Sequence, residues 1–342
     1  MPIIESCYTP PPWGRSAHMQ TIYPTLFRRI SLPSYQRQEF ELPDNDFLDI
    51  DWLATGSRRL AILLHGLEGS SEAHYISALS HQFMHYHWDT AAINQRGCSG
   101  RPNRQLPAYH SGKTEDLKVV IENIIAKKTY EEIFIVGISM GGNITLKYLG
   151  ENGANLPHEI TGACAISTPC CLNTAAEAMC KPSNTIYMRR FLRSFRRKLV
   201  EKQKIYPNDI DLTGFHRINN FHQFDNRYTA PWHDFRDATD YYTKSSCLPV
   251  LVNIKRPTLI VNSKDDPFLS AECYPIKAAQ RNPHLYLIMP NYGGHVGFVA
   301  SKQKQLYWHE SQAVRFAQAT STLSSQQNHK VIKTEALAQF SP

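Results

Sequence analysis

The sequence lacks the features that would place the protein in a membrane, outside the cell or on nucleic acid. No apolar run approaches the ~18 to 20 residues that a membrane-spanning helix needs. Residues Met1–Pro12 carry neither a basic flank nor an apolar stretch, so we expect no secretory signal and a cytoplasmic location. The eight cysteines include no Cys-x-x-Cys pair, which favours reduced and mostly buried thiols.

Excess charge is confined to one segment. The chain has 37 Lys and Arg against 30 Asp and Glu, a net charge of +7. Residues Arg189–Lys204 hold eight of the basic residues and one acid, and the rest of the chain balances at 29 of each sign. A nucleic-acid-binding protein spreads its basic residues over a face or interleaves them with stacking aromatics. We therefore expect no nucleic-acid partner, and at most a local role for this segment.

Short apolar runs alternate with helical patterns along most of the chain, which predicts a parallel sheet covered by helices on both faces. An antiparallel hairpin formed by 38–42 and 47–53 comes first. Strands are then expected at 60–64, 90–93, 133–136, 160–166, 257–261 and 285–289, and helices at 72–85, 114–127, 141–149 and 302–318. Between Ser167 and Lys255 the alternation stops, and aromatic and basic residues dominate.

These patterns divide the chain into four parts. Residues 1–36 are expected to form an irregular arm packed on the core, and residues 37–167 with 251–320 form the core itself. Residues 168–250 are the predicted helical cap, and residues 321–342, mostly small or polar, the predicted flexible tail. The predicted fold class is α/β, with a mostly parallel central sheet flanked by helices and a helical cap insertion.

The strongest functional signal is the run Gly137-Ile138-Ser139-Met140-Gly141. It follows an apolar strand and precedes a helical pattern, which is the setting of a nucleophile elbow. In so tight a turn bulky residues two positions either side of the serine would collide, and the serine Oγ stands above the sheet. The alternative is a glycine-rich helix start capped by an ordinary serine. The strand–turn–helix setting favours Ser139 as a nucleophile.

A serine nucleophile needs a base, and proteins with this elbow supply an acid and then a histidine later in the chain. Asp265 and Asp266 follow the strand 257–261, and His295 follows the next strand after two glycines. Neighbouring side chains in extended backbone point opposite ways, so only one acid can face the imidazole. Asp266 precedes a proline and lies 29 residues before His295, which selects it. Taken singly, His295 is also compatible with an ordinary loop histidine.

Two backbone N–H groups are candidates for an oxyanion hole. One belongs to Met140, directly after the nucleophile, and the other, by its place in the loop after strand 60–64, to Leu67. The His65-Gly66 pair in this loop is also compatible with a simple turn, and Glu68 is interpreted as a loop acid rather than a catalyst. Arg96 suits either an anionic substrate group or a structural brace, and bracing is favoured because a guanidinium satisfies several acceptors.

In these residues the chain resembles the α/β-hydrolases and, within that family, the YheT-like branch of predicted esterases. The resemblance extends roughly from residue 10 to 320 and includes, beyond the elbow, Gly14–Thr21, Asn94–Gly100, Tyr109–Gly112, Asp116 and Asp265–Phe268. It implies a serine hydrolase acting on carboxylic esters, with Ser139, Asp266 and His295 as the catalytic relay. Related eukaryotic members act on lipid esters or transfer medium-chain acyl groups.

We therefore expect a serine esterase that acts on a small-molecule ester through an acyl-enzyme. No organic cofactor is expected and no metal, because His81 and His85 lie four apart on a predicted helix without a third ligand at metal-site spacing. Two alternatives stay open: an acyltransferase that passes the acyl group to an alcohol, and a catalytically silent binding module. The intact triad argues against the second.

One cap segment carries a further pattern. Five apolar residues recur there at helical spacing among arginines, and they are Met188, Phe191, Leu192, Phe195 and Leu199. Such a basic amphipathic helix can lie on anionic lipid, or it can bury its apolar stripe on the domain and show its charges to water. Because the segment falls inside the predicted cap, burial is favoured.

Overall fold

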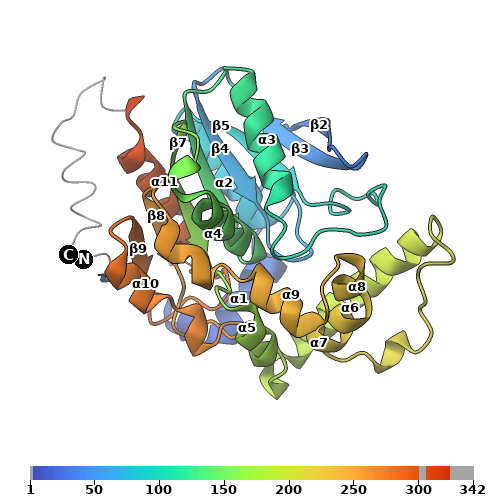
Figure 1. Ribbon diagram of the computed structural model, residues 1–342. Coiled ribbons are helices and arrows are strands. Elements are labelled where there is room, and N and C mark those ends of the chain that lie inside the picture. The colour runs from blue at the N-terminus through green and yellow to red at the C-terminus, as the bar shows by residue number, and fades with distance from the viewer. Residues whose placement is uncertain (1–2, 300–305, 324–342) are drawn as a thin grey trace.

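The computed structural model describes residues 3–299 and 306–323. Within them lies one nine-stranded sheet in the order β1-β9-β8-β7-β6-β4-β5-β3-β2, with helices on both faces (Figure 1). The strands are β1 Ile3–Ile4, β2 Gln36–Glu41, β3 Phe47–Leu53, β4 Arg59–Leu64, β5 Asp89–Asn94, β6 Glu132–Ile138, β7 Ile160–Ile166, β8 Thr258–Val261 and β9 Leu285–Ile288. The pairs β2–β3 and β3–β5 are antiparallel and the other pairs are parallel, which confirms the predicted fold class.

Helices connect the strands and cover the sheet. They are α1 Ala17–Phe27, α2 His74–His85, α3 Glu115–Ala126, α4 Met140–Asn152, α5 Leu172–Met179, α6 Thr185–Gln203, α7 Phe221–Phe224, α8 Ala230–Trp232, α9 Ala238–Ser245, α10 Ile276–Arg281 and α11 Trp308–Thr320. No helix among the described residues combines the length and the apolarity that crossing a bilayer requires.

Each central strand buries both of its faces. On β6, Ile133 and Ile135 pack in one core with side chains of α3 and α4, while Phe134 and Val136 pack in a second core with α2 and α11. Because both sets of alternating side chains are buried, the strand is a continuous apolar run rather than an alternating pattern. β6 therefore lies in the middle of the sheet, and its carboxyl end presents Ser139.

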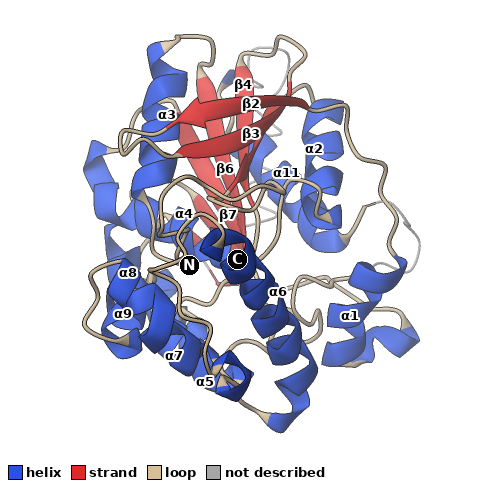
Figure 2. Ribbon diagram, turned by 90° about the vertical axis from the view of Figure 1, so that its right-hand side faces the viewer, coloured by secondary structure: helices blue, strands red, loops and turns tan. Residues whose placement is uncertain are grey.

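The hairpin and the other strands predicted from the sequence appear with ends shifted by at most two residues. The last helix, α11, begins at Trp308 rather than at 302, and residues 300–305 lie outside the described part of the chain. The short helix α10 was not predicted. Between β7 and β8 the chain forms α5 to α9, which gather at one end of the sheet (Figure 2). The four-part division of the chain stays a prediction, and residues 324–342 of the predicted tail are outside the described residues.

The expectation that residues 1–36 are irregular is wrong in part. They contain the strand β1, which extends the sheet edge beside β9, and the helix α1. Pro24 inside α1 obscured the helical pattern, because proline lacks the N–H that a helix interior uses. Arg28, directly after α1, forms a bidentate ion pair with Glu310 on α11 at 2.5 and 2.7 Å.

Two fully buried histidines are neutral in the folded protein. Burial lowers the pKa of His65 to about 4. Burial and the nearby Arg28 charge hold the pKa of His309 well below its usual value. In the unfolded chain both imidazoles titrate near their ordinary pKa of about 6.5. Below that pH the unfolded chain therefore binds more protons than the folded one, and acid favours unfolding.

We predict that the free energy of unfolding falls as the pH is lowered from about 6.5 toward 4. Each neutral histidine adds up to about 1.4 kcal/mol per pH unit to that slope. His309→Leu removes one titrating group, so its slope should be smaller than the wild-type slope by about one proton. Urea unfolding at a series of pH values measures both slopes. Equal slopes in the two proteins would contradict the prediction.

Candidate active site

Ser139 occupies a strained turn between β6 and α4. Its backbone has φ 55° and ψ −117°, a conformation that costs free energy for any residue with a side chain. A Cβ on Gly137 would stand 2.2 Å from the Gly141 carbonyl oxygen, and one on Gly141 would stand 2.4 Å from the Leu64 carbonyl oxygen. Both glycines are therefore required by contact, as the sequence pattern predicted. The Ser139 N–H donates to the Ile166 carbonyl at 2.8 Å, which ties the turn to β7.

The structure brings Ser139, His295 and Asp266 into one hydrogen-bonded chain. Ser139 Oγ lies 2.9 Å from His295 Nε2, and His295 Nδ1 lies 2.9 and 3.1 Å from the two Asp266 carboxylate oxygens. Because a carboxylate only accepts, Nδ1 carries the proton and Nε2 accepts the Ser139 hydroxyl. The Asp266 carboxylate is fully buried, and the Phe268 ring stacks on the imidazole at 4.2 Å.

Asp265 points away from the imidazole. Its Oδ1 accepts the Gly294 N–H at 2.9 Å, and burial raises the pKa of its carboxyl. It therefore holds the loop that carries His295. The two acids lie in the turn after β8, which ends at Val261, so their different directions come from this turn and not from strand alternation. Of the two adjacent acids, only Asp266 contacts His295.

Helix α1 also supports the histidine loop, a contact that the sequence analysis did not assign. The His295 N–H donates to Thr21 Oγ1 at 2.9 Å, and the Val299 N–H donates to Oε1 of the fully buried Gln20 at 2.9 Å. Gly294 lies so close to this helix that a Cβ would stand 2.4 Å from the Ala17 carbonyl oxygen. A sequence signal for this contact was the pair Gln20-Thr21, which belongs to the segment Gly14–Thr21 that carries part of the family resemblance.

The loop after β4 is fixed by His65. Its Nε2 accepts the Gln95 N–H at 3.1 Å, so Nδ1 carries the proton and donates to the Gly66 carbonyl at 2.7 Å. The Gly66 N–H donates to the Tyr75 hydroxyl at 3.2 Å. The next N–H in the loop, of Leu67, and the N–H of Met140 donate to no protein atom among the described residues. Both residues line the same pocket as Ser139.

Glu68 joins this loop to helix α6. Its carboxylate accepts the Tyr109 hydroxyl and the Lys198 ammonium, each at 2.7 Å, and the Ser194 hydroxyl. Ser194 and Lys198 lie one turn apart on α6, and the Glu68 side chain is almost wholly buried. The interpretation of Glu68 as a loop acid agrees with these contacts. They also tie the position of α6 to the segment that carries the Leu67 N–H.

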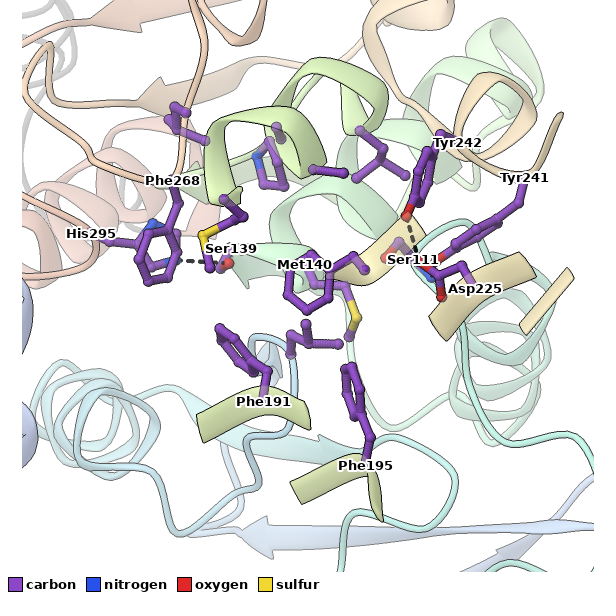
Figure 3. Close-up of a pocket in the computed structure, with 18 residues that line it drawn as sticks. Ser111, Ser139, Met140, Phe191, Phe195, Asp225, Tyr241, Tyr242, Phe268 and His295 are labelled. Carbon is purple, nitrogen blue, oxygen red and sulfur yellow. Dashed lines mark hydrogen bonds between the residues drawn. The ribbon is translucent and has the colours of Figure 1, made fainter. Parts of the chain in front are cut away.

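Ser139 opens into an apolar pocket with a volume of about 110 Å³ (Figure 3). Side chains of α5, α6 and α7 form much of its wall. The lining residues are Leu67, Ser111, Ser139, Met140, Pro169, Leu172, Ala175, Ala176, Met179, Phe191, Phe195, Phe221, Asp225, Tyr241, Tyr242, Phe268, Leu269 and His295. An arrangement of nucleophile, base and acid beside such a pocket can transfer the acyl group of a substrate that carries a hydrocarbon chain.

Arg96 is a brace, which was the favoured interpretation. Its guanidinium binds Asp116 of α3 through two bonds of 2.7 Å and also contacts Asp44 at 2.6 Å and Asp46 at 3.0 Å. The N–H groups of the planar guanidinium therefore bind these carboxylates rather than backbone carbonyls. Arg96 is thereby committed to joining the β2–β3 turn to α3, and it is not among the residues that line the pocket.

Comparison with known proteins identifies the family. Residues 61–204 match the family model described as "alpha/beta hydrolase fold". The chain is 34% identical over 291 residues to "Putative esterase YheT" of Escherichia coli (strain K12), an alignment that covers 83% of this chain and 84% of that protein. The chain belongs to the α/β-hydrolases. Its resemblance to the YheT-like branch is confirmed by the same alignment.

Two further comparisons agree with this family. The chain is 27% identical over 308 residues to "Phospholipase ABHD3" of Homo sapiens, covering 87% of this chain and 75% of that protein. Among solved structures, the Pyrococcus furiosus esterase Pf2001 superposes with a TM-score of 0.57 at 18% identity, covering 84% of this chain and 94% of the other. At that identity the structural likeness shows the shared fold alone.

The two adjacent acids allow a matched test of the hydrogen-bonded chain. We predict that Asp266→Asn lowers kcat for ester hydrolysis by up to about 10⁴-fold, because an amide favours the wrong imidazole tautomer. Asp265→Asn should lower it by about tenfold or less, since it loosens only the loop. Steady-state kinetics on both variants, each shown to be folded by circular dichroism, measures the difference. A larger loss at Asp265 would reverse the assignment.

Proposed function

We propose that the protein is a serine hydrolase that cleaves carboxylic esters through an acyl-enzyme. The observation that carries this proposal is the chain of hydrogen bonds from Ser139 Oγ through His295 to the buried Asp266, set on a strained turn beside an apolar pocket. The relatives named an esterase and a phospholipase support ester hydrolysis as the reaction class.

Acylation begins at the serine. Ser139 Oγ attacks the ester carbonyl carbon as its proton moves to His295 Nε2, and the Asp266 carboxylate stabilises the resulting imidazolium. The Leu67 and Met140 N–H groups, which have no protein acceptor among the described residues, donate to the oxyanion. The tetrahedral intermediate then breaks its bond to the alcohol oxygen, which takes the proton from Nε2 and leaves.

Deacylation repeats these steps with water. His295 Nε2 takes a proton from a water molecule, whose oxygen attacks the acyl carbon, and the same two N–H groups hold the second oxyanion. Collapse of this intermediate breaks the bond to Ser139 Oγ, which regains the proton from Nε2, and the carboxylic acid leaves. The apolar pocket is suited to esters with a hydrocarbon arm, including those of lipids.

The nucleophile assignment has a direct test. We predict that Ser139→Ala lowers kcat for short and long alkyl esters by a factor on the order of 10⁶, because the acyl-enzyme route is lost. A fluorophosphonate probe should label the wild type at Ser139 and leave the variant unlabelled. The exposed Ser183, changed to Ala, is the matched control and should retain both turnover and labelling. Undiminished turnover or labelling of Ser139→Ala would end the proposal.

We further propose that the outer face of α6 contacts anionic lipid surfaces. Arg189, Arg190, Arg193, Arg196 and Arg197 are exposed, and none of them pairs with an acid among the described residues. The apolar stripe of the helix packs inside the protein, where Met188, Leu192 and Leu199 belong to one cluster of buried side chains. Lipid contact would therefore be electrostatic and made by the arginines.

Helix α1 supports the same surface. It lies beside α6, where His18 Nδ1 and the Tyr187 hydroxyl share a hydrogen bond of 3.0 Å (Figure 2). Its exposed side chains include Met19, Leu26 and Phe27, the last 64% exposed. Exposed apolar side chains on a helix that contacts α6 can insert into a membrane interface and so add to the electrostatic attraction of the arginines.

Vesicle sedimentation tests this contact. We predict that the protein binds vesicles containing phosphatidylserine, that binding weakens as salt is raised, and that purely zwitterionic vesicles bind less. Arg189→Gln with Arg193→Gln should reduce binding by about 30-fold, at about 1 kcal/mol for each basic residue near the surface. The control pair Lys277→Gln with Arg281→Gln, on exposed positions of α10, should bind as the wild type does. Salt-insensitive binding, or an equal loss in both pairs, would contradict the proposal.

A further inference from the structure

The pocket has a polar end that the proposed reaction does not use. Figure 3 shows Ser139 and His295 at one end, and Ser111, Asp225, Tyr241 and Tyr242 at the other. Between them the wall is formed by hydrocarbon and thioether side chains, with Met140, Phe191 and Phe195 among them. A carboxylate on such a wall loses hydration, so hydrogen-bond donors must replace the lost water.

The acceptor at this end is the Asp225 carboxylate. Its Oδ1 accepts the Thr229 hydroxyl and its Oδ2 accepts the Tyr242 hydroxyl, each at 2.6 Å. A carboxylate has about four acceptor positions, so two bonds leave room for another donor. Burial raises the pKa of Asp225 to about 6, which leaves it ionised at neutral pH.

The donors at this end are two hydroxyl groups. The Tyr241 oxygen accepts the Ser111 N–H at 3.0 Å, and the Ser111 and Tyr241 hydroxyl groups also interact with each other. Two hydroxyl groups that bond to each other use one of their two protons, so the other proton can donate to a further acceptor. Asn143, four residues after Ser139 on α4, donates to the Ser111 carbonyl at 2.8 Å. The position of Ser111 is therefore tied to the same helix that follows the nucleophile.

Acceptor and donors together select one functional group. A hydroxyl donates one proton and accepts others, so it can donate to Asp225 and accept from Tyr241 or Ser111. An ammonium group only donates and would leave the remaining hydroxyl proton of the Ser111–Tyr241 pair without an acceptor. A carboxylate only accepts, and it would also meet the charge of Asp225.

We propose that Asp225, Ser111 and Tyr241 form a subsite for a hydroxyl group at the far end of the ester's hydrocarbon arm. This inference rests on the proposed esterase function and names its substrate class: esters whose pocket-bound arm ends in a hydroxyl group. The apolar wall then binds the hydrocarbon arm of the ester, and the subsite binds the hydroxyl group at the end of that arm. Such polar recognition discriminates more strongly than apolar contact, because an unsuitable end leaves buried polar groups unpaired.

Two ester series test the subsite. One consists of p-nitrophenyl esters of unbranched acids, the other of acetate esters of unbranched alcohols, and each chain length is made with a methyl end and with a hydroxyl end. In one of the two series the arm enters the pocket, and at one chain length its end reaches the subsite. At that length the hydroxyl-ended ester should have a kcat/KM about tenfold above that of the methyl-ended ester, because one hydrogen bond to a charged group contributes about this much. Esters ending in an ammonium group should show no such gain.

The variants show whether this ratio comes from the subsite. Asp225→Asn and Ser111→Ala should each bring the hydroxyl-to-methyl ratio at least severalfold closer to one, a change that a merely structural role would not produce. Ser111→Ala removes a single hydroxyl group and leaves the backbone contacts of Ser111 in place, so it covers the case in which Asp225→Asn fails to fold. Asp234→Asn, an exposed cap position, is the matched control and should keep the wild-type ratio.

A binding measurement separates failure of the subsite from failure of the esterase proposal. Ser139→Ala protein, titrated calorimetrically, should bind an α,ω-diol about tenfold more tightly than the 1-alkanol of the same length. If neither ester series is hydrolysed but the diol preference holds, the esterase proposal fails and the subsite stands. Equal kcat/KM for both ends in both series, a ratio retained in both variants, or equal binding of diol and alkanol would overturn the subsite.

Discussion

The close packing of the Ser139 turn is the constraint on which the site depends. The turn brings the start of α4 against the loop after β4, and three glycines leave the space. A Cβ on Gly66 would lie 3.1 Å from Ser139 Cβ, and those on Gly137 and Gly141 would lie within 2.4 Å of backbone oxygens. The candidate nucleophile and both candidate oxyanion donors are therefore positioned by one contact between backbones. The strain at φ 55° is sustained because β6 lies at the centre of a sheet that is buried on both faces.

The histidine is held by separate parts of the chain. Asp266 orients the imidazole, Asp265 holds the preceding glycine, and Thr21 of α1 binds the His295 N–H. Arg28 then ties the end of α1 to α11 through a buried ion pair with Glu310. Because breaking one partner of a buried pair is costly, the N-terminal segment is kept in place, and the loop of His295 with it.

Helix α6 joins three parts of the proposed function. Phe191 and Phe195 form the pocket wall, Ser194 and Lys198 bind Glu68 beside the Leu67 N–H, and the arginines face outward. A displacement of this helix at a lipid surface would therefore change the pocket and the oxyanion loop together. The Glu68 contacts resist such a displacement, since the carboxylate is almost wholly buried and loses its bonds to Ser194 and Lys198 if α6 moves.

The parts of the site that could be predicted are those whose residues lie close together in the sequence. The elbow is five consecutive residues between a strand and a helix, and the candidate acid and histidine each follow an apolar strand. The residue types and their order could therefore be recognised in the sequence. Helix α1 was missed because Pro24 interrupts its pattern. The polar end of the pocket could not be predicted from the sequence. Ser111 and Tyr241 lie 130 residues apart, and they meet only when the segment between β7 and β8 folds against the rest of the chain. The candidate residues for bond cleavage thus lie in short motifs beside strand ends. The proposed substrate recognition depends on long-range contacts that only the folded structure brings together.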